Sequence, residues 1–233
     1  GGTMQRRARP EEHGLLVLEN GGPGEDWAGV EMLPPMPPPE RCEQCAESSC
    51  GVTLVLALIC VFVGLTQAAA TSSMEKPKTW VFLGLIYAEA IVALVCLLGI
   101  LCADPGTIQR SPSTCFPLPE QVAELVRAGR PIEGLRNIRE NGRSFCVRCL
   151  VWRPDPQGRA GSDDDSDEFE EGEVHHCSTC QRCVRDFDHH CGVFGRCIAG
   201  KGFAGTMGYF KVIISMGVAG CVTSFGFLLV GHF

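Results

Sequence analysis

The 233-residue chain has no excess of basic residues, since 20 Lys and Arg stand against 27 Asp and Glu and the formal charge is −7. This acidic balance excludes a nucleic-acid-binding protein that relies on bulk positive charge. Cysteine is too sparse, at 15 residues, for a small secreted disulfide scaffold. The cysteines cluster instead with four of the six histidines, which favours metal ligands over disulfide bridges.

Charge is also nearly missing from three long stretches of the chain. Residues 48–74 and 212–231 carry no charged side chain, and residues 80–103 carry only Glu89. A helix needs about 20 apolar residues to cross a bilayer, so we expect three membrane-spanning helices. The alternative is that one run is a buried or interfacial helix. Because an acid inside a membrane is costly, we expect Glu89 to face a partner helix or to be protonated.

Three spans place a large loop, residues 104–209, on one side of the membrane. Its many thiols would tend to form disulfides in an oxidising lumen. We therefore expect this loop and the N-terminus to be cytosolic and residues 71–78 to be lumenal. The chain begins at Gly1 and stops just after the third apolar run, so we expect it to be a fragment.

The composition divides the chain into successive regions. Between Pro119 and Arg143, a helix pattern places Val122, Leu125 and Val126 on one face. The predicted regions are a disordered N-terminal tail (1–47), two transmembrane helices with a short lumenal loop (48–103), a cytosolic linker (104–144), a Cys-rich zinc domain (145–200) with an acidic insertion (161–173), and a third transmembrane segment (201–233).

Within the Cys-rich region, Cys and His follow the spacing of metal ligands. CxxC spacing lets one tight turn supply two thiolates to a tetrahedral zinc ion. The acidic insertion cannot pack into a core, and we interpret it as a solvated loop inside the zinc module. The donors are Cys146 and Cys149, then His175, His176, Cys177, Cys180 and Cys183, and finally His189, His190, Cys191 and Cys197.

The sequence Asp188-His189-His190-Cys191, in a Cys-rich loop between apolar spans, resembles the DHHC family of protein S-acyltransferases. Asp104-Pro105-Gly106 matches a motif that the family places after its second span. Arg153-Pro154 follows the first CxxC as in the family, and the spacing from His176 to Cys197 matches as well. The resemblance extends over about residues 50–231.

The resemblance implies an α-helical polytopic membrane protein with a cytosolic two-zinc loop domain, in which a fourth span is missing from this chain. It assigns Cys191 as the nucleophile, His189 as its base and Asp188 as the group that orients the base. Both zinc sets have no open position, so the ions would be structural. Cys146, Cys149, His176 and Cys183 would hold the first ion, and Cys177, Cys180, His190 and Cys197 the second.

The implied reaction moves a long-chain acyl group from acyl-CoA, often palmitoyl-CoA, to Cys191 and then to a cysteine of a substrate protein. Its partners would be acyl-CoA, membrane lipid and proteins with membrane-proximal cysteines, and no nucleic acid. The expected location is an endomembrane (Golgi or ER) or the plasma membrane. Because adjacent residues cannot line up on one helix face, we also expect a backbone bend at the DHHC motif, enforced by zinc on His190.

The chain departs from the family pattern beside the catalytic cysteine. Gly192 and Val193 replace a Pro-Trp pair, and Gly195 and Arg196 replace an Asn pair. These changes leave a catalytically impaired, membrane-anchored zinc scaffold as the alternative function. A RING-type ubiquitin ligase is disfavoured, because no second late CxxC follows.

A further CxxC, Cys42 and Cys45, precedes the first apolar run. It could form a third metal site, could accept S-acylation, as juxtamembrane cysteines often do, or could consist of plain reduced cysteines.

Overall fold

The computed structural model describes residues 29–71, 76–132, 134–154 and 174–231. The chain forms two compact units, each built from two stretches of sequence. Unit 1 comprises Gly1–Pro37 with Ile108–Glu168, and unit 2 comprises Pro38–Thr107 with Phe169–Phe233. The acidic insertion predicted at 161–173 lies outside the described residues, as do residues 1–28 of the predicted tail.

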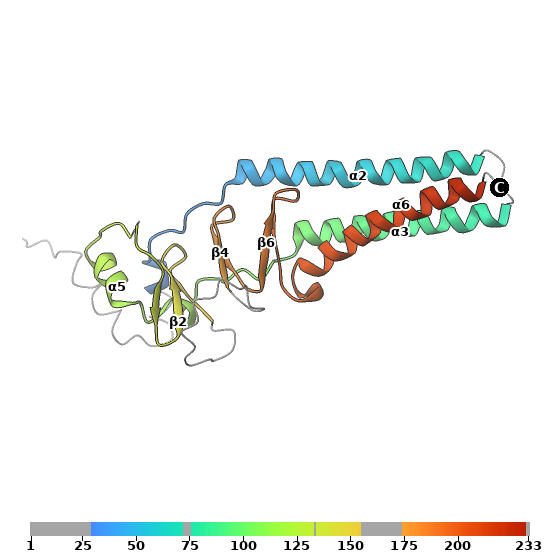
Figure 1. Cartoon of the computed structure of the whole chain (residues 1–233). Helices are drawn as coiled ribbons and strands as arrows, with labels where there is room; N and C mark the ends of the chain where they lie inside the picture. The colour runs from blue at the N-terminus through green and yellow to red at the C-terminus, as the bar shows by residue number, and fades with distance from the viewer. Residues whose placement is uncertain (1–28, 72–75, 133, 155–173, 232–233) are drawn as a thin grey trace, which may run out of the picture. The chain divides into compact units, whose positions relative to one another are not determined.

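Unit 2 contains three long helices that pack against one another, α2 (Arg41–Thr71), α3 (Lys76–Cys102) and α6 (Met207–Gly231). Figure 1 shows them side by side, with the end of α2, the start of α3 and the end of α6 at one end of the bundle. By length and composition all three could cross a membrane.

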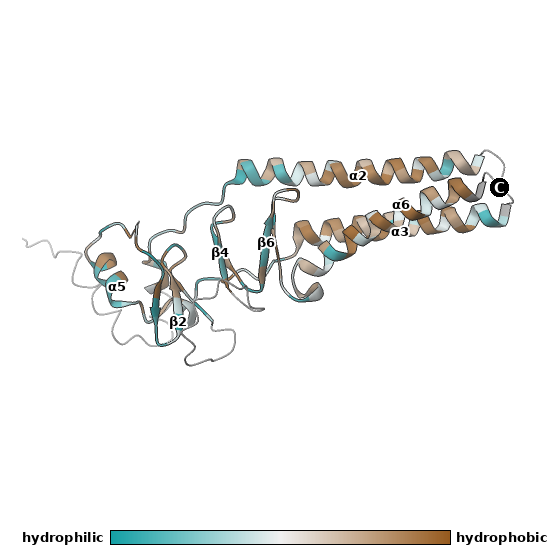
Figure 2. Cartoon of the chain, viewed as in Figure 1, coloured by the Kyte–Doolittle hydropathy of each residue, from teal (hydrophilic) through white to brown (hydrophobic). Residues whose placement is uncertain are grey.

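Most of the apolar surface of this bundle faces outward. In the most apolar part of each helix, only 17 to 22% of the residues are buried against protein. Figure 2 shows brown, apolar residues along most of the length of the three helices. An apolar surface of this extent is typical of helices that lie in lipid. The predicted fold class, a polytopic membrane protein with a Cys-rich domain, is confirmed.

Close approaches of the helices explain small residues in the bundle. Gly99 lies against the ring of Tyr209, and a Cβ at Gly220 would lie 2.9 Å from the ring of Phe62. Glu89 faces the neighbouring helix α6, where Thr223 Oγ1 donates a hydrogen bond of 2.8 Å to its Oε1. This contact agrees with the first alternative for Glu89, a position against a partner helix.

Two antiparallel hairpins carry the Cys-rich part of unit 2. β4 (His175–Cys177) pairs with β5 (Arg182–Val184), and β6 (Phe187–Cys191) pairs with β7 (Arg196–Ala199). A short 3₁₀ helix, η1 (Gly202–Ala204), then leads into α6. The strands are short, and the apolar cluster between the hairpins is correspondingly small, with four buried residues: Cys177, Val184, Cys197 and Ala199.

The predicted end of the disordered tail at residue 47 is wrong, because α2 begins at Arg41. The first turns of α2 are polar, which Figure 2 shows as teal, and they lie against the two hairpins. Hydrogen bonds from Gln44 and Ser48 to the hairpins hold this extension in helical form. The sequence pattern shows where apolar residues begin but not where a helix acquires a protein partner.

Unit 1 contains α4 (Pro112–Cys115), α5 (Glu120–Arg127) and a three-stranded antiparallel sheet of β1 (Ile138–Glu140), β2 (Arg143–Cys146) and β3 (Val151–Arg153). The predicted helix after Pro119 is therefore present but short, and Gly129 follows it with a positive φ of 61°. Trp152 packs edge-on against Phe145 and donates from Nε1 to Pro117 O at 2.6 Å.

Candidate functional site

Two of the CxxC turns, Cys146–Cys149 and Cys177–Cys180, share one backbone arrangement. The residue after the second cysteine is left-handed in both, with φ of 54° at Leu150 and 53° at Gln181. In the turn that ends at Cys180, the backbone N–H of Cys180 donates to Cys177 Sγ at 3.4 Å. Such turns aim two sulfurs at one point, which is the arrangement that a metal ion requires.

The second predicted set of donors lies wholly within unit 2, and its four donor atoms lie within 4.8 Å of one another. Around a tetrahedral zinc ion, the usual bond lengths give about 3.6 Å between N and S and about 3.8 Å between two S atoms. The observed spacing is close to these values. His190 Nδ1 lies 3.5, 3.4 and 3.8 Å from the sulfurs of Cys177, Cys180 and Cys197, and the last two sulfurs are 3.3 Å apart.

Shared hydrogen bonds set the acidity of these three thiols. Hydrogen bonds from Cys180 and Cys197 hold the pKa of Cys177 well below its usual range. The hydrogen bond to Cys177 raises the pKa of Cys180 to about 11, and those to Cys177 and Cys180 also raise the pKa of Cys197. A bound cation replaces the thiol protons, because zinc ligands are thiolates.

The first predicted set consists of two pairs, one in each unit. In unit 1, Cys146 and Cys149 are buried at the turn between β2 and β3. In unit 2, His176 and Cys183 are opposite one another across β4 and β5, with 3.9 Å between Nδ1 and Sγ. Among the described residues of unit 2, the second predicted set is thus a group of three Cys and one His that could bind a metal ion.

Sequence reasoning missed the acid that contacts the second set. Glu47 Oε2 of α2 lies 3.1 Å from His190 Nε2, the ring nitrogen that faces away from the thiols. Gln44, one turn earlier, donates from Nε2 to Cys180 Sγ at 3.3 Å. Their spacing of three residues on a helix was visible in the sequence, but nothing there indicated which residues this face contacts.

The DHHC motif lies on strand β6 (Phe187–Cys191). The expected effect of zinc on the backbone at His190 stays a prediction. A register irregularity falls between Phe187 and His189, and from His189 onward the strand pairs regularly with β7. Successive side chains of a strand point to opposite faces. His190 therefore faces the donor set with Cys197, its cross-strand partner, while His189 and Cys191 share the other face.

Of the three predicted catalytic residues, Cys191 is buried, whereas Asp188 and His189 are partly exposed. Asp188 Oδ2 lies 2.6 Å from His189 Nδ1, and both side chains are about half exposed, at 55% and 42%. The ring of His189 meets the ring of Phe210, on α6, edge to face with 5.4 Å between centroids. Cys191 is only 8% exposed and belongs to the buried core at the end of the helical bundle.

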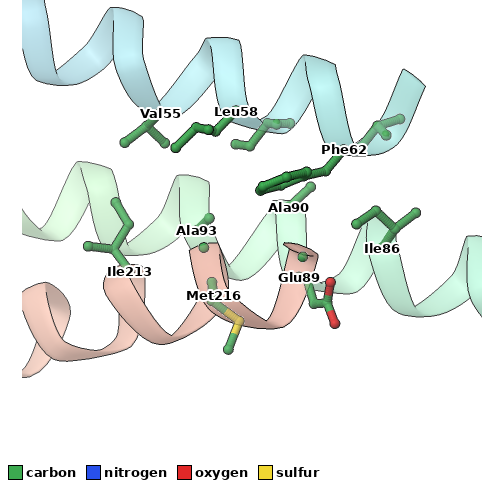
Figure 3. Close-up of a pocket in the computed structure, with 13 residues that line it drawn as sticks. Val55, Leu58, Phe62, Ile86, Glu89, Ala90, Ala93, Ile213 and Met216 are labelled. Carbon is green, nitrogen blue, oxygen red and sulfur yellow. The ribbon is translucent and has the colours of Figure 1, made fainter. Parts of the chain in front are cut away.

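An apolar pocket continues from this core into the bundle. Figure 3 shows it between side chains of α2, α3 and α6, with Val55, Ala93 and Ile213 among them. These three residues also belong to the core cluster that contains Cys191. Deeper in the bundle the pocket is lined by Phe62 and Glu89. The pocket and the thiol thus share part of their lining.

The turn after α3 joins that helix to the second hairpin. Asp104 Oδ1 accepts hydrogen bonds from the backbone N–H groups of Gly106 and Thr107. Burial opposes its ionisation, but these hydrogen bonds and the charge of Arg196 outweigh burial and place the pKa of Asp104 below its usual range. Arg196 also donates to Ala103 O at 2.8 Å.

Comparison with known proteins agrees with this geometry. A family model described as DHHC palmitoyltransferase matches residues 168–232. Palmitoyltransferase Hip14 of Drosophila melanogaster is 31% identical over 128 residues, which cover 55% of this chain and 16% of that protein. The family model and these relatives are similar to this chain across the DHHC motif and its surroundings, as the sequence resemblance implied. The resemblance stated from the sequence is thereby confirmed.

Two further DHHC-family relatives show how much of the chain is shared. Probable protein S-acyltransferase 6 of Arabidopsis thaliana is 29% identical over 135 residues, with 54% of this chain and 27% of that protein covered. Palmitoyltransferase ZDHHC9 of Pongo abelii is 25% identical over 166 residues, with 65% and 36% covered. The chain spans 16 to 36% of the lengths of these three relatives.

Proposed function

We propose that the chain is a protein S-acyltransferase, which moves a long-chain acyl group from acyl-CoA to Cys191 and then to a cysteine of a substrate protein. The observation that carries this proposal is the position of Cys191 on β6. It shares a strand face with His189, and it is buried in the core from which the apolar pocket extends. A nucleophile, a base and a place for a fatty chain thus lie together.

Zinc ions at the two Cys and His groups would have a structural role. The donor set of three thiols and one imidazole suits zinc and leaves no coordination position for a substrate. Cys177, Cys180, His190 and Cys197 would hold one ion, and Cys146, Cys149, His176 and Cys183 the other. When bound, zinc supplies folding free energy, which hairpins of this size need.

In the first step, His189 accepts the proton of the Cys191 thiol, and Asp188 stabilises the imidazolium through Nδ1. The thiolate attacks the carbonyl carbon of the acyl-CoA thioester. The new C–S bond to Cys191 forms as the bond to the sulfur of coenzyme A breaks. The proton on His189 passes to the departing thiolate, so free coenzyme A and acyl-Cys191 result.

In the second step, a cysteine thiol of the substrate protein gives its proton to His189 and attacks acyl-Cys191. The acyl group moves to the substrate, and the Cys191 thiolate regains a proton from His189. One thioester replaces another in each step, so the exchange needs no separate energy source.

The apolar pocket suits the methylene chain of the acyl group. Each methylene kept from water contributes about 0.8 kcal/mol, so a sixteen-carbon chain needs an extended apolar environment. Val55, Ala93 and Ile213 begin such an environment beside Cys191. The substrates would be proteins whose cysteines come close to the membrane, because the thiol lies where the bundle meets the hairpins.

The Cys-rich hairpins would face the cytosol, in the Golgi, the ER or the plasma membrane. Free thiols and thiolate ligands persist in the reducing cytosol, whereas an oxidising lumen favours disulfides. The short connection between α2 and α3 would then be lumenal. No nucleic acid is among the expected partners.

Incubation of the purified, zinc-loaded protein with an acyl-CoA analogue that carries a detectable chain tests the proposal. We expect a label on Cys191 that hydroxylamine removes, as it removes other thioesters. Cys191→Ser should lose this label and keep both metal ions, whereas Cys45→Ser, which changes an exposed thiol on α2, should keep the label. Wild-type protein that retains zinc but takes no label would instead be the membrane-anchored zinc scaffold.

A further inference from the structure

The polar extension of α2 reaches the second donor set through one carboxylate. Glu47 and His190 are 143 residues apart in the sequence, yet Oε2 of the acid lies 3.1 Å from Nε2 of the ring. Both side chains are well covered, with exposed fractions of 20% for Glu47 and 14% for His190. By comparison, the Asp188–His189 pair is about half exposed. The contact is thus largely shielded from solvent, unlike ordinary surface ion pairs.

The geometry of His190 assigns a distinct partner to each ring nitrogen. Nδ1 lies within 3.8 Å of three thiol sulfurs, so this nitrogen is the one that can bind a metal ion. Nε2 must then carry the ring proton, and Glu47 is its acceptor. A carboxylate that accepts from a ligating imidazole fixes the tautomer and the rotation of the ring.

Neighbouring contacts hold Glu47 in register with the hairpins. Ser48 Oγ donates to Phe194 O at 2.7 Å, and Gln44 donates to Cys180 Sγ. At Gly51, a Cβ atom would lie 2.7 Å from the ring of Phe194, so the absence of a side chain lets α2 approach this closely. Three successive turns of α2 therefore contact the Cys-rich hairpins, and Glu47 lies in the middle turn.

A glycine in the β6–β7 turn also lets α2 approach. Gly195 is left-handed, with φ of 62°, and it lies directly against Gln44 of α2. A side chain at this position would collide with the helix. The glycine at 195 and the docking of α2 are thus two parts of one arrangement.

We propose that Glu47 is a positioning residue for the second metal set, and that it acts by accepting the Nε2–H hydrogen bond of His190. This inference rests on the proposed binding of zinc by Cys177, Cys180, His190 and Cys197. Glu47 orients the imidazole of His190 on the face of β6 that carries the second donor set. The opposite face of the same strand carries Cys191. The polar start of α2 is therefore a functional part of the catalytic module.

Metal release from the full-length protein tests the role of Glu47 without relying on activity. The variants are Glu47→Ala, which removes the acceptor, and Glu47→Gln, which keeps an oxygen acceptor without the charge. Glu43→Ala is the matched control, because Glu43 is an exposed acid one turn earlier on the same helix. Zinc release is followed with a chromogenic chelator, and bound Co²⁺ is examined through its ligand-field absorption bands.

Loss of such an outer hydrogen bond typically costs about 10- to 100-fold in metal affinity. We expect Glu47→Ala to release one of its two zinc ions about 10 to 100 times faster than wild type and to alter the Co²⁺ bands of that ion. Glu47→Gln should stay within about threefold of wild type, and Glu43→Ala should match wild type.

Wild-type release rates and unchanged Co²⁺ bands in Glu47→Ala would overturn the inference. Equal release from Glu47→Ala and Glu47→Gln would overturn positioning by a hydrogen bond. Should Glu47→Ala fail to fold, Glu47→Asp takes its place, because the shorter side chain withdraws the carboxylate from His190 Nε2 and should likewise release zinc faster and alter the Co²⁺ bands, whereas wild-type behaviour of Glu47→Asp would overturn the inference. Wild-type protein that binds no metal would contradict the proposed zinc sites themselves, which is a separate result from any difference among the variants.

Discussion

The helical bundle and the Cys-rich hairpins of unit 2 gain stability from different sources. The bundle consists of helices of 25 to 31 residues with an extensive apolar surface. The hairpins consist of strands of three to five residues, and only four buried residues form their own apolar cluster. Two of these four, Cys177 and Cys197, also belong to the group that could bind a metal ion. Helices in lipid can fold by themselves, whereas hairpins of this size need a metal or a neighbour.

The largest expected effect comes from removing a donor of the second set. Cys180→Ala should release one zinc ion and unfold the two hairpins, because structural zinc contributes about 10 to 16 kcal/mol in small zinc domains. The bundle should stay helical. Metal analysis together with limited proteolysis and circular dichroism would show whether the two regions separate in this way.

Cys221→Ser is the matched control for that experiment, since Cys221 lies on α6 outside both donor groups. It should keep two zinc ions. Loss of bundle helicity in Cys180→Ala would contradict the separation of the two regions.

The next largest effect is expected for the base. His189→Ala should slow formation of the acyl-enzyme about 10²- to 10⁴-fold, the usual contribution of general base catalysis. Its zinc content should equal that of wild type, because His189 faces away from the donors. Single-turnover labelling of Cys191 measures the rate. Loss of zinc from His189→Ala would show that the face of β6 with His189 also supports metal binding on the opposite face.

A smaller effect is expected where the bundle and the hairpins meet. Gly195→Ala places a Cβ atom 2.7 Å from Ser48 Oγ at a left-handed residue, so α2 or the β6–β7 turn must shift. We expect a loss of about 1 to 3 kcal/mol, within the range for backbone strain of this kind. Gly64→Ala is the control, because nothing lies near its Cβ position. Thermal unfolding of the zinc-loaded protein compares the two variants.

The smallest effect is expected inside the bundle. Thr223→Val keeps the shape of the side chain but removes the hydrogen bond to Glu89. Hydrogen bonds between membrane helices contribute about 0.6 kcal/mol on average, so unfolding in detergent should shift only slightly. A loss as large as that of Gly195→Ala would show that Glu89 has a greater structural role than one polar contact between helices.

The sequence alone was sufficient to predict features that a local pattern determines, such as a long apolar run or the spacing of Cys and His. Three runs with at most one charge predicted three spans. The Cys and His spacing predicted metal ligands, which the resemblance to the DHHC family divided into two sets. The face of each residue in the DHHC motif was harder to predict, because a bend and a strand both separate adjacent side chains. Local pattern cannot distinguish the two, and the pairing of β6 with β7 assigns the faces.

The contacts of α2 could not be predicted because they depend on residues far apart in the chain. Glu47 and Ser48 were assigned to the tail and to the start of the first apolar run, and no periodicity links them to His190 or Phe194. The left-handed backbone at Gln181 was equally hidden, since a glycine usually marks such a position. These features depend on tertiary contacts, which the local sequence pattern does not indicate.

The length of α2 has a mechanical consequence. Its 31 residues extend for about 46 Å, whereas the hydrocarbon layer of a bilayer is about 30 Å thick. The lipid-embedded segment and the segment that contacts His190 are parts of one continuous rod. When a thicker or thinner bilayer changes the tilt of this rod, the turns at Gln44 and Glu47 must move with it. On the proposed function, membrane thickness would therefore be coupled to the position of Glu47 beside the second donor set.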